Sequence, residues 1–229
     1  MEDRKVSLKV LKLFILGLPG SGKSSVARYT ASYLEDRNWK SIHFSDHVIL
    51  QRMFHTDSEG KLFRPTDHGG FDILDLNAFD MALQVLDTAL QVLEQEVNQQ
   101  LLSAKQEKIV LVEFSRNDYL RAFQQFSDTF LRDAHFLYLD VGTETCKSRI
   151  RERTANPNTT DDFYVSEYIF NTYYNKDDGQ EIPQILARDY SFDKKRIKVI
   201  KNNGSFDDIV EEINEFVDRI GEFENLRGS

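Results

Sequence analysis

The sequence predicts an α/β fold in which one five-stranded parallel sheet carries helices on both faces. Five short apolar runs alternate with longer stretches of helical period, and the runs cover residues 11–16, 41–44, 108–114, 134–140 and 196–201. Each run is rich in Val, Ile, Leu or Phe, which is typical of parallel strands covered on both sides. The stretches between the runs are long enough for crossover helices, so strand and helix alternate along the chain.

Length and composition agree with this fold class. The chain has 229 residues, of which 40% are apolar; this suits one domain over residues 1–229 with a substantial core and excludes a disordered or fibrous chain. A net charge of −9 disfavours broad binding to nucleic acid. The single cysteine, Cys146, excludes an internal disulfide and a cysteine-based zinc site. Because no apolar run is long enough to span a membrane, we expect a cytoplasmic protein without a membrane partner.

The longest helical stretch is predicted over residues 77–103. Apolar residues recur there at spacings of three and four and form one stripe: Phe79, Leu83, Leu86, Leu90, Leu93, Val97 and Leu101. We interpret the stripe as the face that packs on the sheet. A seam that pairs two copies of the chain into a homodimer stays open as the alternative.

The strongest motif directly follows the first apolar run. Residues 17–24 read Gly-Leu-Pro-Gly-Ser-Gly-Lys-Ser, which is the phosphate-loop pattern. Glycines let backbone N–H groups surround a phosphate, and the following helix adds a partial positive charge at its N-terminus. Lys23 then contacts the β- and γ-phosphates, and the hydroxyl of Ser24 is a magnesium ligand. The motif predicts binding of ATP with Mg²⁺ at Gly17, Gly20, Ser21, Gly22, Lys23, Ser24 and Ser25.

Other classes of phosphate-loop protein carry further motifs. Residues 67–70 and 175–178 match the Asp-x-x-Gly and Asn-Lys-x-Asp strings of GTPases, but neither string follows an apolar run. A motor or assembly ATPase ends a strand with an acidic pair, whereas the run 108–114 holds one acid, Glu113. Both classes are therefore disfavoured.

Three segments resemble adenylate kinases and related nucleoside monophosphate kinases. Residues 108–119 resemble the segment that reads Asp-Gly-Phe/Tyr-Pro-Arg in that family, and Arg116 falls on the arginine that holds the phosphate of the acceptor. Residues 138–153 are similar to the fourth strand and the helix that enters the lid. Arg149 matches the arginine that covers the adenine, and Arg153 matches the one that reaches the transferring phosphoryl group. Residues 199–205 resemble the last strand and the loop behind the adenine.

The resemblance implies a three-layer P-loop NTPase fold with a small lid. Asp161 and Asp162 follow Arg153 at the spacing of family members with a short lid, so the lid is expected at about 154–180. The segment of about 46–103, which contains the long helix, is expected to be an acceptor-side insert.

The chemistry of the two arginines agrees with this implication. Arg149 and Arg153 are four residues apart on a predicted helix, so both cations point to one side. Phosphoryl transfer is catalysed mainly by positioning and by positive charge around the γ-phosphate. A solvated helix face stays open as the alternative for both residues.

The sequence also departs from the family. The lid arginines expected near 159 and 170 are Thr159 and Phe170, and the aspartate of the third strand is Val112, with Glu113 one place later. Glu113 could ligate magnesium through water, or accept a proton from a hydroxyl as a glutamate at this strand end does in deoxynucleoside kinases. A carboxylate that merely caps the strand is the alternative.

The acceptor region is unlike that of adenylate kinases. Asp46 follows the second predicted strand, and the carboxyl ends of parallel strands are where this fold binds ligands. We therefore predict Asp46 as the acceptor-side or magnesium-side carboxylate. Residues 64–75 contain a cation, a histidine and three acids, and they suit a polar acceptor pocket and a surface turn equally well.

These observations predict an ATP-dependent phosphotransferase with Mg²⁺ as its metal. The acceptor is a small molecule or nucleotide that we expect not to be AMP, and it enters beside Asp46, Glu113 and Arg116, with Arg153 and Lys23 as further catalytic residues. Two alternatives stay open: a nucleotide-binding regulatory module that hydrolyses ATP slowly, and a polynucleotide 5′-hydroxyl kinase, against which the net charge counts.

Overall fold

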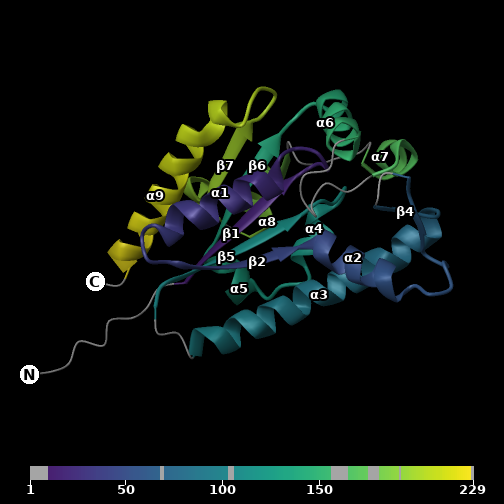
Figure 1. Cartoon of the computed structure of the whole chain (residues 1–229). Coiled ribbons are helices and arrows are strands. Elements are labelled where there is room, and N and C mark those ends of the chain that lie inside the picture. The colour runs from purple at the N-terminus through teal and green to yellow at the C-terminus, as the bar shows by residue number, and fades with distance from the viewer. Residues whose placement is uncertain are drawn as a thin grey trace, which may run out of the picture.

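A computed structural model describes residues 10–67, 70–102, 106–155, 165–174, 181–190 and 192–227 of the chain. Several sequence predictions lie outside these residues: the lid positions Thr159, Asp161 and Asp162, the string 175–178, and positions 68–69 of the predicted insert. The structure has the predicted α/β fold (Figure 1).

The five predicted strands form one parallel sheet with the order β2-β5-β1-β6-β7. The strands are β1 (Val10–Gly17), β2 (Lys40–Ser45), β5 (Lys108–Phe114), β6 (Ala134–Asp140) and β7 (Ile197–Lys201). Each lies within one residue of its predicted bounds at both ends. The three central strands β5, β1 and β6 are almost entirely buried, whereas the edge strands β2 and β7 contain polar residues and are partly exposed.

The side chains of β1 alternate between the two faces of the sheet. Leu11, Leu13 and Ile15 belong to a buried cluster with α1 (Lys23–Glu35) and α9 (Val210–Arg227). The short 3-10 helix η4 (Asp207–Ile209) leads into α9. Figure 1 shows α1 and α9 side by side on this face.

Phe14 and Leu16 of β1 point to the opposite face, where a second cluster lies. Its helices are the C-terminal half of α3 (Leu76–Leu102), α4 (Tyr119–Phe123), α5 (Asp128–Arg132) and α8 (Ile182–Asp189). The 3-10 helix η3 (Lys194–Arg196) precedes β7. Helices thus cover both faces, which gives the three layers of the predicted fold.

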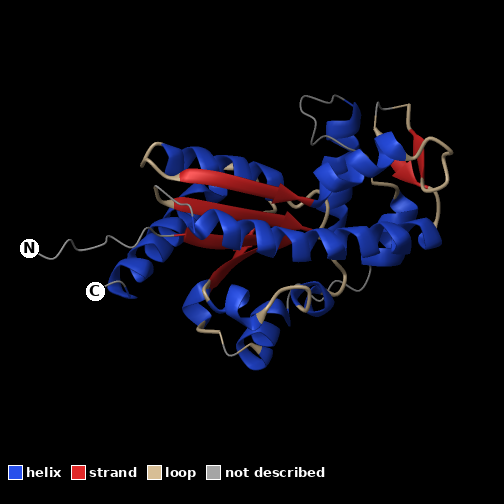
Figure 2. Ribbon diagram, turned by 90° about the horizontal axis from the view of Figure 1, so that it is seen from below, coloured by secondary structure: helices blue, strands red, loops and turns tan. Residues whose placement is uncertain are grey.

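Helices and a small hairpin lie beyond the carboxyl ends of the strands (Figure 2), and their side chains form a third apolar cluster. It joins α2 (Asp46–Thr56), the N-terminal half of α3, α6 (Thr143–Ala155), α7 (Glu167–Tyr173) and an antiparallel hairpin of β3 (Phe63–Pro65) and β4 (Phe71–Ile73). This hairpin is not predictable from the sequence pattern, because each strand has three residues and the first ends in proline.

The apolar stripe of the long helix α3 therefore packs into two different clusters. Leu90, Leu93 and Val97 pack on the sheet as predicted, whereas Phe79 and Leu83 belong to the third cluster. The N-terminal half of the helix extends past the sheet and covers the region where the strands end.

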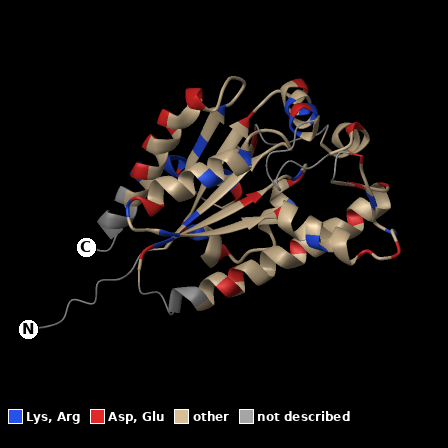
Figure 3. Ribbon diagram, viewed as in Figure 1, with Lys and Arg blue, Asp and Glu red and all other residues tan. Residues whose placement is uncertain are grey.

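Charged residues lie mainly on the outer sides of the helices, with acids along α9 and mixed charges on α6 (Figure 3). Within the described residues, no helix combines the length and the apolar character that crossing a membrane would require.

Candidate nucleotide and acceptor site

The phosphate loop connects β1 to α1 with a backbone that only glycine adopts readily. Gly20 and Gly22 have φ angles of 81° and 100°. A Cβ atom on Gly20 would lie 2.5 Å from the carbonyl oxygen of Cys146, and one on Gly22 would lie 2.8 Å from Nδ2 of Asn202. Both glycines are therefore required by backbone conformation and by space.

Two side chains from distant parts of the chain hold the loop in place. The N–H group of Gly17 donates to the hydroxyl oxygen of Tyr119 at 2.9 Å, and Nδ2 of Asn202 donates to the carbonyl oxygen of Ser21 at 2.8 Å. Tyr119 and Asn202 are buried. The loop is thus fixed before any ligand is bound, which lowers the entropic cost of binding a phosphate group.

Lys23 is the first residue of α1 and points back over the loop. Its Nζ atom donates to the carbonyl oxygens of Gly17 and Leu18 at 2.9 and 2.8 Å. Burial lowers the pKa of Lys23 to about 8, although Glu113 and Asp46 favour its charged form. A phosphate group placed on the loop would restore the charged form, because it brings negative charge beside the ammonium group.

Strand register brings Ser24, Glu113 and His43 together. Glu113 pairs with Ser45 of β2 and with Ile15 of β1, and like Ile15 it points to the face that α1 covers. Oγ of Ser24 donates to Oε1 of Glu113 at 3.1 Å, and Nε2 of His43 lies 3.2 Å from the same oxygen.

Glu113 is ionised in this environment. Its side chain is only 3% exposed. Burial opposes ionisation, but the hydrogen bond and the charge of His43 and the charge of Lys23 outweigh it, so the pKa of Glu113 lies below its ordinary value. The other carboxylate oxygen, Oε2, is buried and accepts no hydrogen bond from the described residues. That oxygen is available to a ligand.

Asp46 and Arg116 form a buried ion pair at the carboxyl ends of β2 and β5. Asp46 begins α2, directly after Ser45, and Arg116 follows β5 by two residues. Nη1 of Arg116 donates to Oδ2 of Asp46 and, at 2.9 Å, to the carbonyl oxygen of Ser115. Burial raises the pKa of Asp46, although Arg116 acts in the opposite direction. Arg116 stays charged, because attraction to Asp46 outweighs its burial and raises its pKa.

A second carboxylate lies on the far side of Arg116. Nη2 of Arg116 is 3.8 Å from Oδ1 of Asp87 in α3, and Oδ2 of Asp87 is 3.5 Å from Nη2 of Arg121. Asp46, Arg116, Asp87 and Arg121 thus form a row of alternating charges whose sum is zero.

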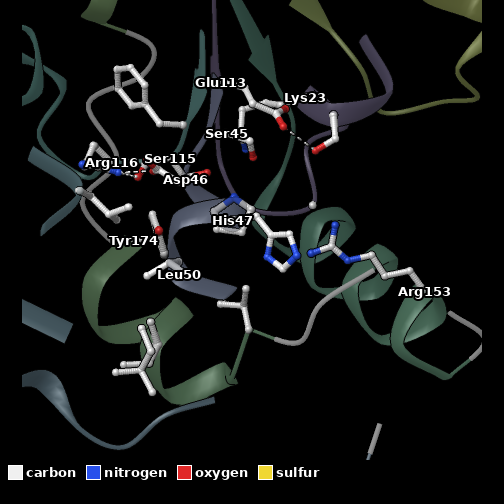
Figure 4. A pocket seen from close by; sticks show the side chains of 18 of the residues that line it. Lys23, Ser45, Asp46, His47, Leu50, Glu113, Ser115, Arg116, Arg153 and Tyr174 are labelled. Atoms are coloured by element: carbon white, nitrogen blue, oxygen red, sulfur yellow. Dashed lines mark hydrogen bonds and ion pairs between the residues drawn. The ribbon is translucent and has the colours of Figure 1, made fainter. Parts of the chain in front are cut away.

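One cavity of about 320 Å³ connects the phosphate loop with this ion pair. Its walls include Gly20, Gly22, Lys23, Ser24 and Ser25 on one side, and Asp46, Glu113, Ser115 and Arg116 at the strand ends. Figure 4 shows the side chains of Lys23, Glu113, Asp46 and Arg153 around this space. The cavity therefore brings together the predicted catalytic residues.

The two predicted arginines of α6 both line the cavity. Nη2 of Arg149 donates to the carbonyl oxygen of Gly204 at 2.7 Å, which connects α6 to the loop after β7. The guanidinium of Arg153 points into the cavity (Figure 4). By contrast, Arg151 is exposed and pairs with Glu167 of α7. Helical spacing therefore predicted correctly that Arg149 and Arg153 share one side of the helix.

The segment 64–75, which suited either a pocket or a surface turn, contributes part of the cavity wall. Phe71, Asp72 and Ile73 of β4 line the cavity. Asp72 is buried, and its Oδ2 atom accepts from Nη2 of Arg64 at 3.0 Å. Arg64 itself is mostly exposed, and the segment thus combines a buried side with a surface side.

Sequence reasoning missed His43, Asp87 and Tyr119. His43 could have been found, because it pairs with Leu111 on the strand beside it and thus lies on the same face as Glu113. Asp87 and Tyr119 gave no local signal, since each reaches the site through the packing of a helix on the sheet.

No protein-family model matches the chain, and no curated protein matches it in sequence. Solved structures do match over nearly the whole chain. A gluconokinase from Sinorhizobium meliloti has 15% identity and a TM-score of 0.50, covering 96% of this chain and 98% of its own. Kti12 from Chaetomium thermophilum, in complex with ADP-AlF3, has 16% identity and a TM-score of 0.57, with coverage of 92% and 97%.

The Mycobacterium tuberculosis APS kinase CysC, in complex with AMPPNP and APS, also matches. It has 14% identity and a TM-score of 0.51, and the match covers 92% of this chain and 99% of the kinase. At such identities the likeness shows the fold alone: an α/β fold with a five-stranded parallel sheet between helices, which these structures share with this chain. The closer resemblance to adenylate kinases stays a prediction.

Proposed function

We propose that this protein is an ATP-dependent phosphotransferase that transfers the γ-phosphoryl group of Mg·ATP to an acceptor other than AMP. The observation that carries the proposal is the single cavity that joins the phosphate loop to Asp46 and Arg116. A protein that only binds or hydrolyses ATP has no need of a second, walled compartment beside the γ-phosphate position.

The nucleotide side is assigned to the phosphate loop and α6. The backbone of Gly17–Ser25 surrounds the phosphates, and Lys23 supplies a cation next to the position of the β- and γ-phosphates. Arg149 donates to the carbonyl oxygen of Gly204 in the loop after β7, and the resemblance implies that both lie beside the adenine. Matched structures hold ADP-AlF3 and AMPPNP, which supports ATP as the nucleotide.

Magnesium fits between Ser24 and Glu113. The described residues contain no cluster of three or more His, Cys, Asp or Glu side chains that could hold a metal alone. Mg²⁺ in such sites takes few protein ligands and several phosphate or water oxygens. The free Oε2 atom of Glu113, next to the hydroxyl of Ser24, suits this role. Bound there, Mg²⁺ would neutralise charge on the phosphates.

Asp46 was also a predicted metal ligand, but its pairing with Arg116 favours a role toward the acceptor. A hydroxyl oxygen of the acceptor attacks the γ-phosphorus, and the bond from the γ-phosphorus to the bridging oxygen breaks. ADP leaves with the electron pair of that bond, and the hydroxyl proton passes to Asp46, whose raised pKa suits a base. Lys23 and Arg153 stabilise the charge that develops on the transferred group.

The experiment is ADP release from Mg·ATP, measured alone and with a panel of nucleosides, nucleotides, phosphosugars and oligonucleotide 5′ ends. Lys23→Ala is the blank. We expect one acceptor class to stimulate release at least about tenfold, which equals about 1.4 kcal/mol of barrier. Release that no acceptor stimulates would overturn the proposal and favour a regulatory ATPase. Stimulation by oligonucleotide ends alone would identify a polynucleotide kinase.

A further inference from the structure

We propose that the acceptor is an uncharged alcohol with an apolar body, and that Arg116 positions Asp46 instead of holding a phosphate of the acceptor. The inference rests on the proposed function, because it concerns the acceptor side of the same cavity. It follows from the charges and the walls of that side.

The charge of Arg116 is already matched by its neighbours. Asp46 accepts a hydrogen bond from one guanidinium nitrogen, and Asp87 lies 3.8 Å from another. The side chain of Arg116 is 4% exposed, so water screens these interactions weakly. A phosphate on Arg116 would place a dianion beside two carboxylates whose side chains are only 13% and 15% exposed, and like charges at that distance repel strongly.

The remaining acid on this side is matched as well. Asp72, in the wall made by β4, is paired with Arg64 at 3.0 Å. Among the described residues, the other Lys and Arg side chains of the cavity belong to the nucleotide side: Lys23 and Arg28 come from α1, and Arg149 and Arg153 come from α6. An acceptor with a net negative charge therefore meets, among the described residues that line its own side, no Lys or Arg besides Arg116.

The walls farther from the phosphate loop are mainly apolar. Their apolar side chains come from α2, β4, α3 and residues 165–174, and they include Leu50, Phe71, Ile73, Phe79, Leu83 and Ile169. Two polar side chains lie among them: His47, whose ring stacks on Phe71, and Ser166. Most of the apolar side chains are buried in the third apolar cluster and form a fixed surface. A ligand with many hydroxyl groups would leave them without hydrogen-bond partners against such walls. An acceptor with an apolar body and one hydroxyl group would contact the apolar walls with its body and Asp46 with the reacting hydroxyl.

The test measures ADP release from Mg·ATP with three groups of probes. The first group holds uncharged alcohols on planar or aliphatic bodies: thymidine, pyridoxine and geraniol. The second holds the anions thymidine 5′-monophosphate, AMP and gluconate, and the third holds the uncharged polyols glycerol and sorbitol. We expect at least one alcohol of the first group to stimulate release about tenfold or more, and the other groups to stimulate it less than about twofold.

The outcomes separate this inference from the proposed function. Stimulation by an anion or a polyol, with none from the first group, would overturn the inference and leave the phosphotransferase intact. Acceptor-independent release with all probes would overturn both.

Arg116→Gln tests the positioning role with the alcohol that stimulates best. A positioning residue affects kcat, so we expect kcat to fall at least about 100-fold and the acceptor KM to stay within about threefold. A rise in the acceptor KM at unchanged kcat would mean that Arg116 binds the acceptor, and would contradict the inference. Because this variant leaves Asp46 buried without its partner, the double variant Asp46→Asn/Arg116→Gln serves as the folded reference.

Leu83→Ala tests the apolar wall, and Met81→Ala on the same helix is its matched control. Leu83 is buried and lines the cavity, whereas Met81 is 54% exposed. We expect Leu83→Ala to raise the acceptor KM about tenfold and to leave the KM for ATP unchanged, since only acceptor contacts are lost. Equal effects of the two variants on the acceptor KM would argue against an apolar acceptor site.

Discussion

Among single residues, Lys23 has a charge that depends strongly on its surroundings. Burial lowers its pKa to about 8, so the empty site loses this positive charge as the pH rises through that value. A bound phosphate group interacts favourably with the charged form of Lys23, and the phosphate itself is fully ionised above about pH 7. Nucleotide affinity is therefore coupled to the protonation of one lysine.

We expect the Kd of the wild-type protein for Mg·ADP to rise about tenfold between about pH 7 and pH 9, because Lys23 is neutral at the upper end of that range. Calorimetric titration across the range measures the effect. Lys23→Arg is the control, since an arginine stays charged throughout and its curve should be nearly flat. A flat wild-type curve would contradict a phosphate-binding role of Lys23.

Two carboxylates at neighbouring strand ends have different partners. Glu113 is next to the hydroxyl of Ser24, while Asp46 is paired with Arg116. We expect Glu113→Gln to raise the Mg²⁺ concentration for half-maximal ADP release about tenfold, because an outer or direct ligand of the metal is lost. Asp46→Asn should lower kcat without this shift. Equal shifts in both variants would show that the two residues do not divide these roles.

At the scale of elements, the phosphate loop depends on the close packing of α6 against it. Gly20 and Gly60 both have positive φ angles, 81° and 61°, but they differ in the space around them. A Cβ on Gly20 meets the carbonyl oxygen of Cys146 at 2.5 Å, whereas the nearest atom for Gly60 is 3.8 Å away. Alanine at Gly60 therefore introduces backbone strain alone, whereas alanine at Gly20 introduces backbone strain and a steric clash.

We expect Gly60→Ala to lower the free energy of unfolding by about 1–2 kcal/mol, the cost of a left-handed alanine. Gly20→Ala should cost more and also abolish Mg·ADP binding, because the loop must move away from α6. Urea unfolding and calorimetric titration measure the two effects. If Gly20→Ala bound Mg·ADP normally, the loop would not need its contact with α6.

Helix α3 offers a matched pair for the packing on the sheet. Leu90 is fully buried, and Val92, two residues later, is 44% exposed. We expect Leu90→Ala to lower the free energy of unfolding by about 2–5 kcal/mol through the cavity it leaves. Val92→Ala should change it by less than about 0.5 kcal/mol. A large effect at Val92 in urea unfolding would indicate that this face is covered, as in a homodimer.

The elements that the sequence predicted well are those with a long, regular pattern. The five strand segments and the stripe of α3 each place apolar residues at several positions of a regular pattern, and each became the expected element. The hairpin β3–β4 escaped prediction because three residues are too few for a pattern. Its place depends on contacts of Phe63 and Phe71 with the third cluster.

The same division holds for the candidate site. The phosphate loop and the acids at the strand ends could be found, since motif and topology place them together. The partners of these residues could not be found from local pattern: Asp87 reaches Arg116 from the middle of α3, and Tyr119 reaches Gly17 from α4. Phe79, Leu83 and Leu86 line the cavity, but they were predicted only as part of the helix face that packs on the sheet.

For the molecule as a whole, the cavity lies where elements from distant parts of the chain meet. Its walls come from the loop after β1, from α2, the hairpin, α3, the end of β5, α6 and α7. A nucleotide bound there contacts segments far apart in sequence, which separate when the protein unfolds. Binding should therefore stabilise the entire fold.

We expect Mg·ADP at 100 times its Kd to stabilise the wild-type protein by about 2.7 kcal/mol. For a chain of this size the gain corresponds to a rise in Tm of about 5–10 °C. Lys23→Ala should lose most of the rise at the same ligand concentration. Lys61→Ala is the matched control and should keep it, because Lys61 is exposed and pairs only with Glu59 among the described residues. A rise that Lys23→Ala retains in full would place the nucleotide elsewhere, because the stabilisation would then not depend on the cation of the phosphate loop.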